Sequence, residues 1–415
     1  MTKNKIYFLI TIFALGLVAI YISMASSLNP WSKVLPHLDS AVWLRCGVGM
    51  KQGQVVYRDL FDHKGPILFL IQWLGFTITP HSLTGIWILE CIFMWVTLVS
   101  FYLCARIFSD SKLVGFLAAV LSLHGLLYFY QQGNCVEEWA LPFMGFSLFI
   151  FLKYLKTEKA SKVHILIAGM CMACSFLLNG NLIAVWVSYV LIIAVKLIIR
   201  KQYQDLGMCV GMFTLGMMII FSITSIVLGI NGALGDFIKI YFGFNSEYAG
   251  GVTVKTFVLS ILNFIYADTW FVVMNIVLFS NLLHDLLTNK KVDYRWSAFL
   301  YTAISLCLLS MSGRGYEHYG IQLVPCMIVP MVVCIEKIRC WCGSSKEFLI
   351  ILAVTSIFFL KFSVDEYNED IRWTMTEGVD NYYAGGDIEN YTVVNDWIGG
   401  RWTDEQIDKW VVNDL

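Results

Sequence analysis

The sequence predicts an all-α polytopic membrane protein, and composition and hydrophobic patterning carry this prediction. Hydrophobic residues make up 58% of the 415 residues and charged residues only 14%, and the mean hydropathy is +0.68. Apolar stretches of roughly 18 or more residues recur along most of the chain, and each is long enough to span a bilayer. Backbone amides inside lipid are satisfied within helices. Several soluble domains, which the length alone would allow, are therefore excluded.

About eleven transmembrane helices are expected. The first is an apolar run from Ile6 to Met24, preceded by Lys3 and Lys5. This run is longer than the core of a usual signal peptide, so we interpret it as an uncleaved spanning helix. The predicted spans begin near Ile6, Leu83, Lys112, Leu141, His164, Leu182, Leu206, Phe257 or Trp270, Trp296, Ile321 and Phe348.

The first connection, about residues 29–81, is long enough to hold helices of its own. From Asp39 to Met50 we expect a helix lying in the membrane interface, with Asp39 as its N-cap or just inside it. Gly53 ends this helix. The segment from Ile67 to Phe76 predicts a second, short apolar helix along the membrane surface.

The positive-inside rule places the N-terminus in the cytoplasm of a plasma membrane, in a chain that looks bacterial. With that orientation every inner connection is rich in Lys and Arg, and the C-terminus lies outside the cytoplasm. The inner cations are Arg106, Lys112, Lys153, Lys156, Lys159, Lys162, Arg200, Lys201, Lys290, Lys291, Arg295, Lys337, Arg339 and Lys346.

The charge distribution divides the chain into a membrane module, residues 1–363, and an acidic tail, residues 364–415. From Asp365 onward there are 13 Asp and Glu against 3 Lys and Arg, whereas the rest of the chain has a net charge of +9. The tail also contains many aromatic residues, which suggests a small folded cap. Because the basic residues are scattered over short connections and form no single patch, we expect no nucleic-acid binding.

The segment from Tyr57 to Pro66 is the most informative part of the chain. It packs Arg58, Asp59, Asp62, His63 and Lys64 into a short stretch just ahead of an apolar run. Ionisable residues at the edge of a membrane bundle are costly to maintain, so they indicate a functional site.

Four other segments on the predicted outer side add polar or charged residues. These are Asp39; Asn134, Glu137 and Glu138; Asn245, Glu247 and Tyr248; and Arg314, Glu317, His318 and Tyr319.

Acids combined with cations at the outer surface suit transfer from a lipid phosphate. A cation stabilises the charge that develops on a phosphate leaving group, and a carboxylate can act as general base toward an acceptor hydroxyl. Each residue also has a structural alternative. Asp39 would cap a helix, Lys64 would extend to the interface, and Glu137 and Glu138 would complement the dipole of the next helix.

The order and spacing of these residues resemble bacterial glycosyltransferases of the GT-C class, of the protein-mannosyltransferase-like and aminoarabinose-transferase-like type. The resemblance covers roughly residues 1–340. It rests on an acid after the first span, followed by Gly53-x-x-x-Tyr57-x-Asp59-x-x-Asp62-x-Lys64-x-Pro66, Gly133-Asn134-x-x-Glu137, Phe244-Asn245-x-x-Tyr248 and Gly313-Arg314-x-x-x-His318-Tyr319. The chain departs from the pattern in three ways. Ser40 follows the first acid where many members have a second acid, Gly65 stands between Lys64 and Pro66 in place of a first proline, and the tail is far shorter than the large outer domain of many members.

The resemblance implies an inverting transferase that uses a polyprenyl-phosphate-linked sugar and a cell-envelope acceptor. By this likeness Asp39 is the catalytic acid, Lys64 contacts the lipid phosphate, and Glu137 or Glu138 is the second acidic position. We therefore assign candidate roles as follows: catalytic, Asp39, Glu137 and Glu138; donor phosphate, Lys64, Arg58, Arg314 and His318; substrate, Tyr57, Asp59, Asp62, His63, Asn245, Tyr248 and Tyr319.

No cofactor is assigned, and a divalent metal ion bridging Asp59, Asp62 or Glu137 to a phosphate stays open. Two other functions are weighed against the transferase. A flippase or exporter of lipid-linked saccharides would place ionisable groups near the bilayer midplane, in matching halves. A polysaccharide polymerase would concentrate its chemistry in a large late loop. Here the richest connection follows the first span.

Overall fold

The computed structural model describes residues 3–248, 252–290, 293–342, 344–377 and 387–411, and most of these residues are helical. Within these ranges the only β pairing is one isolated bridge between Val56 and Leu60. The all-α class is therefore confirmed. The helices are α1 (Lys3–Ser23), α2 (Leu38–Lys51), α3 (Pro66–Ile78), α4 (Thr84–Phe108), α5 (Lys112–Leu121), α6 (Leu126–Phe129), α7 (Val136–Thr157), α8 (Lys162–Phe176), α9 (Ala184–Ile199), α10 (Tyr203–Ile230), α11 (Leu234–Phe237), α12 (Asn245–Tyr248), α13 (Val254–Ala267), α14 (Thr269–Asn289), α15 (Ser297–Ser310), α16 (Ile328–Trp341), α17 (Ser345–Arg372), α18 (Ile388–Trp397) and α19 (Asp404–Val411).

Several helices continue one another through short 3-10 or π-helical turns. The 3-10 turns are η1 (Ser122–Gly125), η3 (Tyr294–Trp296) and η4 (Glu317–Met327), and the π turns are η2 (Ile238–Phe244) and η5 (Trp373–Glu377). The η1 turn joins α5 to α6, and η4 leads into α16. Both are buried, and they pack against each other in the interior of the bundle.

Seven helical segments of the described ranges are long and apolar enough to cross a membrane. They are Lys5–Ser23, Thr84–Phe108, Lys112–Phe129, Val136–Thr157, Tyr203–Ile230, Thr269–Asn289 and Glu317–Trp341. Shorter apolar helices occupy Pro66–Ile78, Lys162–Phe176, Ala184–Ile199 and Val254–Ala267. The protein is thus a multi-pass membrane protein, and the count of eleven spans stays a prediction.

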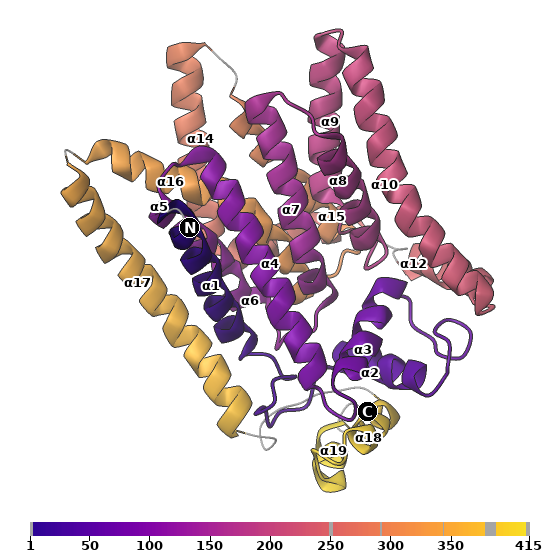
Figure 1. The fold of residues 1–415 in the computed structure, drawn as a ribbon. Coiled ribbons are helices and arrows are strands. Elements are labelled where there is room, and N and C mark those ends of the chain that lie inside the picture. The colour runs from indigo at the N-terminus through magenta and orange to yellow at the C-terminus, as the bar shows by residue number, and fades with distance from the viewer. Residues whose placement is uncertain (1–2, 249–251, 291–292, 343, 378–386, 412–415) are drawn as a thin grey trace.

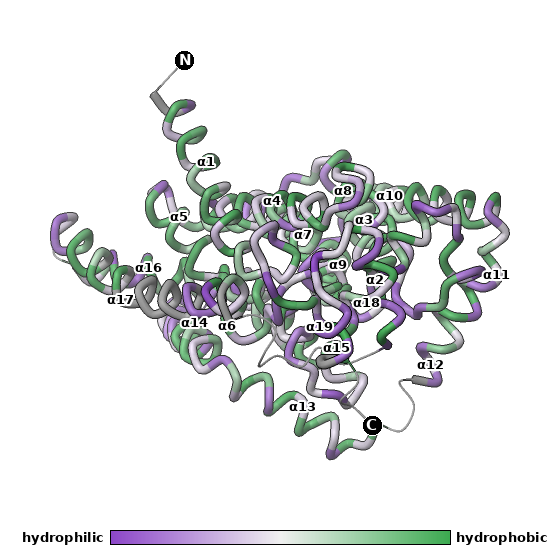
Figure 2. Tube along the Cα trace, turned by 90° about the horizontal axis from the view of Figure 1, so that it is seen from below, coloured by the Kyte–Doolittle hydropathy of each residue, from purple (hydrophilic) through white to green (hydrophobic). Residues whose placement is uncertain are grey.

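Helix packing in the bundle depends on small residues that let backbones approach. In the α8–α10 pair, a Cβ at Gly169 would lie 2.1 Å from the Phe213 carbonyl oxygen, and one at Gly216 would lie 2.1 Å from the Leu166 oxygen. Close contact through small residues is the usual way in which helices associate where apolar surface faces lipid. The outer face of α10 carries exposed apolar side chains, and Figure 2 shows this helix as mostly hydrophobic.

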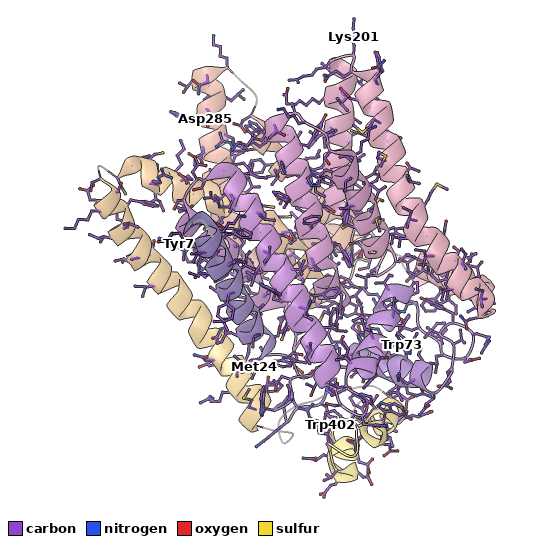
Figure 3. All side chains as sticks on the ribbon, in the orientation of Figure 1. Tyr7, Met24, Trp73, Lys201, Asp285 and Trp402 are labelled. Atoms are coloured by element: carbon purple, nitrogen blue, oxygen red, sulfur yellow. The ribbon has the colours of Figure 1, made fainter. Side chains whose placement is uncertain are left out.

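The two ends of the bundle differ. Figure 3 shows Lys201 and Asp285 at one end, and Met24, Trp73 and Trp402 at the other. The second end holds α2 and α3, with α18 and α19 next to them (Figure 1). It is the end where the candidate site lies.

The helix α2 runs from Leu38 to Lys51, close to its predicted bounds, and α3 runs from Pro66 to Ile78. Asp39 lies in the first turn of α2, and the N-cap is His37. The expectation that Asp39 is just inside the helix is thus correct, and the alternative of an N-cap is wrong. A carboxylate in the first turn complements the helix dipole.

The two C-terminal helices pack on the chain just before and along α2. The Tyr391 hydroxyl donates to the Pro36 carbonyl oxygen at 3.1 Å, and the Arg401 guanidinium donates to the Asn29 carbonyl oxygen at 2.9 Å. The preceding helix α17 runs without a break from Ser345 to Arg372, across the predicted division at residue 363. The described part of the tail is therefore folded onto the same end as α2.

Candidate active site

The backbone of Lys64 is fixed by hydrogen bonds at both its amide and its carbonyl oxygen. Its amide donates to Asp62 Oδ1 at 2.7 Å, and its carbonyl oxygen accepts from the Tyr57 hydroxyl at 2.7 Å. Tyr57, Asp62 and Lys64 are all buried. The ammonium itself forms no ion pair, because no carboxylate of the described residues lies within 4.0 Å of it. A lysine in a buried segment whose ammonium has no carboxylate in direct contact is suited to receive an anion.

Gly65 explains one departure from the family pattern. Its amide donates to the Leu178 carbonyl oxygen at 3.0 Å, in the turn after α8. A Cβ at this position would lie 1.8 Å from the Leu177 carbonyl oxygen. The glycine therefore lets the Lys64 segment dock directly on the α8 turn, and Pro66 then starts α3 at a position where a missing amide hydrogen costs nothing.

Asp39 faces this segment from the first turn of α2. Its carboxylate interacts electrostatically with Asp62 and with Glu137. Glu137 in turn interacts with Lys64, and both of its carboxylate oxygens are buried without a hydrogen-bond partner among the described residues. Three acids therefore gather around one cation at the junction of α2, α3 and α7.

Glu138 is turned to a different environment, because consecutive helical residues point about 100° apart. It is buried, and it accepts a hydrogen bond from the Tyr130 hydroxyl at 3.2 Å. It interacts electrostatically with Glu90 of α4. Of the two candidate glutamates, the structure brings only Glu137 next to Lys64 and Asp39.

His318 closes another side of the group from η4. It is buried and interacts electrostatically with Lys64 and His37. Its Nδ1 lies 2.9 Å from Gln131 Oε1, and its ring packs edge-on against Tyr319, with 4.8 Å between the ring centroids. The cavity beside His318 has a volume of about 10 Å³, roughly the space of one water molecule, so a sugar donor requires it to widen. Its lining residues are His37, Asp39, Ser40, Trp43, Gly133, Asn134, Cys135 and His318.

Two charged candidates stand outside this group. The Arg58 guanidinium pairs with Asp59 at 2.8 Å, and it also donates to the Asn231 carbonyl oxygen at 2.9 Å. Both side chains are substantially exposed, at 46% and 32%. Arg58 thus serves as a link between loops in this structure, and the hydrogen bonds from Arg58 hold the pKa of Asp59 at about 2.

Segment 231–248 covers the Lys64 loop from the other side. Asn245 Nδ2 donates to the His63 carbonyl oxygen at 2.8 Å, and the Phe244 ring packs against Phe61 and His63. Arg314 interacts electrostatically with His63 and therefore lies near this loop. Tyr248 is the last residue of α12, and its side chain lies outside the described part of the structure.

Burial shifts the pKa values of Asp62 and His63, the two titratable residues directly before Lys64. It raises the pKa of Asp62 to about 6, against the opposing effects of the Lys64 amide and charge. Burial also lowers the pKa of His63 to about 4, assisted by the charges of Lys64 and Arg314. At neutral pH, His63 is therefore uncharged and Asp62 is mostly ionised.

The sequence singled out Asn134 but not its buried partners Gln72 and Glu90, which lie behind the site. Asn134 Oδ1 accepts from Gln72 Nε2 at 2.7 Å and from Trp139 Nε1 at 3.0 Å, and its Nδ2 donates to Ser40 Oγ at 2.8 Å. Its amide donates to Glu90 Oε1 at 2.6 Å. A glutamate in the middle of an apolar span is the sequence signal that could have revealed this network.

As for a metal, the described ranges contain no group of three or more His, Cys, Asp or Glu residues arranged to hold one. Asp59 forms its ion pair with Arg58 and does not belong to the group of acids around Lys64. A divalent ion that bridges Asp59, Asp62 or Glu137 to a phosphate stays a prediction.

Comparisons with solved structures identify the fold. The chain is similar to ArnT from Cupriavidus metallidurans in the apo state, with a TM-score of 0.53 and 12% identity, over 96% of this chain and 78% of that one. The same enzyme bound to undecaprenyl phosphate matches with a TM-score of 0.55 and 13% identity, over 96% and 76%. An Archaeoglobus fulgidus oligosaccharyltransferase tethered to an acceptor peptide matches with a TM-score of 0.53 and 13% identity, over 95% of this chain and 55% of that one. No protein-family model and no curated protein sequence matches the chain.

Proposed function

Since the chain has the fold of the GT-C glycosyltransferases, we propose that it transfers a sugar from a polyprenyl-phosphate-linked donor to a cell-envelope acceptor. The similarity of ArnT, which has been seen bound to undecaprenyl phosphate, supports the class of donor. The positive-inside pattern supports a site at the outer face of the plasma membrane, with the N-terminus in the cytoplasm and the C-terminus outside.

The observation that carries the proposal is the position of Lys64. Its backbone is fixed by Tyr57, Asp62 and the Gly65 contact, while its ammonium has no carboxylate within 4.0 Å among the described residues. A phosphate would pair directly with this ammonium. The neighbouring acids Asp39 and Glu137 then lie beside the sugar that the phosphate carries.

The reaction is a single displacement at the anomeric carbon. Asp39 accepts the proton of the acceptor hydroxyl, and the oxygen forms a bond to the anomeric carbon from the face opposite the phosphate. The bond between the anomeric carbon and the phosphate oxygen breaks, and its electron pair stays on that oxygen. The products are an inverted glycoside and polyprenyl phosphate, which has gained one negative charge that Lys64 stabilises.

The surrounding residues have supporting roles in this proposal. Glu137 orients the acceptor or the donor sugar beside Asp39, and His318 and Arg314 line the phosphate side. Tyr57, Asp62, His63, Asn245 and Tyr319 shape the pocket that the donor enters. Glu138 and Arg58 are used in contacts away from Lys64, and we assign them no catalytic step.

The test is transfer by membranes that contain matched amounts of protein. Radiolabelled polyprenyl-phosphate sugars of several types are supplied to the wild type, to Asp39→Asn and to Asp110→Asn, an exposed acid between α4 and α5 that serves as a control. General-base catalysis contributes about 10²–10⁴-fold, so Asp39→Asn is expected to lose transfer by that factor while Asp110→Asn retains it. Equal transfer by Asp39→Asn and wild type would remove Asp39 from the mechanism.

A further inference from the structure

The turn before α7 has an unusual backbone. Gln131, Gln132, Gly133 and Asn134 have φ angles of 43°, 68°, 79° and 52°, so four consecutive residues adopt the left-handed region. Only one of them is a glycine. For a glutamine this conformation is costly, and it persists only where surrounding contacts enforce it.

The contacts that enforce the turn come from α4 and from the chain after α1. Asn134 N–H donates to Glu90 Oε1 at 2.6 Å, and Ser27 N–H donates to the Gln132 carbonyl oxygen at 2.9 Å. At Gly133 a Cβ would lie 2.7 Å from both Glu90 Oε1 and Ser26 Oγ. The backbone of the turn is therefore clamped by α4 and by the chain after α1.

On its front side the turn reaches the acid-bearing helix. Trp139 Nε1 can only donate a hydrogen bond, so the Asn134 atom facing it is the oxygen, and the amide nitrogen must face Ser40. Asn134, Gln72 and Trp139 are each 0% exposed, and Ser40 is 1% exposed. This network ties the starts of α2 and α7 to the middle of α3.

The same turn also holds the histidine on the opposite wall of the cavity. Gln131 Oε1 lies 2.9 Å from His318 Nδ1, and Gln131 Nε2 donates to Glu317 at 3.0 Å. Both ends of one four-residue turn thus contact a wall of the cavity: Asn134 contacts the helix of Asp39, and Gln131 contacts His318.

We propose that Asn134 is a positioning residue, which sets the place of Asp39 through its hydrogen bond to Ser40, and that the left-handed turn 131–134 fixes Asp39 and His318 relative to each other. The inference rests on the proposed function for its catalytic consequence. It also explains why a serine stands at position 40, where many GT-C members have a second acid. The Ser40 hydroxyl oxygen accepts a hydrogen bond from the side-chain amide of Asn134.

A positioning role for Asn134 and a purely structural one predict different effects of substitution on kcat and on the donor KM. Lys64 is held by Tyr57, Asp62 and the α8 turn, none of which depends on Asn134. Removal of the Ser40 hydroxyl should therefore lower kcat and leave the donor KM unchanged. A misplacement of about 1 Å costs on the order of 10²-fold in rate, so we expect Ser40→Ala to lose about 10- to 100-fold in kcat.

The experiment uses Ser40→Ala, Ser40→Thr, Asn134→Ala and the double variant Ser40→Ala/Asn134→Ala in lipid nanodiscs. The matched control is Ser188→Ala, a buried serine of α9 whose hydroxyl donates to the Ala184 carbonyl oxygen of the same helix at 2.7 Å. We expect Ser40→Thr, which keeps a hydroxyl, to recover most of kcat. In the double-mutant cycle, Asn134→Ala should cost less on the Ser40→Ala background than on the wild type, because both act through one hydrogen bond.

A second readout is independent of activity. Hydrogen–deuterium exchange of residues 38–45 should increase in Ser40→Ala and Asn134→Ala and stay at the wild-type level in Ser188→Ala. Unchanged exchange in both variants would overturn the inference, as would additive losses in the cycle or a donor KM that rises as much as kcat falls. If the wild type transfers no sugar, the proposed function fails, and the exchange result alone decides whether Asn134 positions α2.

Discussion

Gly65→Ala is the sharpest test of how the fold places the proposed phosphate-binding lysine. Gly65 has φ −79° and ψ 158°, angles that alanine adopts freely. The substitution therefore introduces no backbone strain, and its whole effect comes from the new methyl group. That methyl would lie 1.8 Å from the Leu177 carbonyl oxygen and 2.3 Å from its carbon.

The size of the expected effect follows from these distances. An ordinary contact begins at 3.4 Å, so the Lys64 segment or the α8 turn must move by about 1.6 Å. Overpacking of this kind costs about 1–3 kcal/mol of stability. Because Lys64 is the adjacent residue, its ammonium moves as well, and displacement on the order of 1 Å lowers the rate about 10²-fold.

The assay is the initial rate of transfer over a range of donor concentrations, in nanodiscs, after folding has been checked by size exclusion and thermal unfolding. Gly207→Ala in α10 is the control, since a Cβ there meets nothing within 4 Å. We expect kcat/KM for the donor to fall about 100-fold in Gly65→Ala and to stay unchanged in Gly207→Ala. A folded Gly65→Ala protein with the wild-type kcat/KM would refute the view that this docking places Lys64.

Three further predictions concern stability and the covering segments. Burial raises the pKa of Asp62 to about 6 from a usual 3.8, so the folded state binds this proton more tightly than the unfolded state does. The free energy of unfolding therefore decreases as pH rises between these two values, by up to about 3 kcal/mol. The unfolding temperature should fall more between pH 4.5 and pH 7 for wild type than for Asp62→Asn. Asn245→Ala removes the hydrogen bond to the His63 carbonyl oxygen and should raise the donor KM several-fold with little change in kcat, and an unchanged KM would contradict a covering role. Arg401→Ala removes charged hydrogen bonds that hold the C-terminal helices near α2, worth about 1.5–3 kcal/mol, so limited proteolysis should release residues 387–411 faster than in wild type.

The fold class could be predicted from the sequence because lipid imposes one solution on long apolar segments. The two helices of the first connection were also predictable. Pro66 starts one of them, and the helix carrying Asp39 ends at Lys51, just before Gly53, which has a φ of +89°. The number of spans was harder to predict, because apolar helices such as α8 and α9 are shorter than a full bilayer crossing.

The candidate site could be predicted only in part. Asp39 and Lys64 stand out because charge is rare in this chain, and the structure brings both into one group with Glu137. The distinction between Glu137 and Glu138 depends on the rotation of α7 about its axis. The roles of Gly65 and Asn134 depend on backbone contacts with distant segments, which the sequence alone does not encode in any local pattern.

The most direct test of the central claim follows the labelled sugar and its lipid together in proteoliposomes. Wild type and Asp39→Asn would receive a polyprenyl-phosphate-linked labelled sugar in one leaflet, with acceptor-containing membrane extract on the same side. The proposed mechanism predicts that wild type releases one polyprenyl phosphate for each sugar transferred, and that Asp39→Asn releases almost none. Intact labelled lipid that changes leaflet equally in both proteins, with no sugar released from it, would contradict the account and identify a flippase.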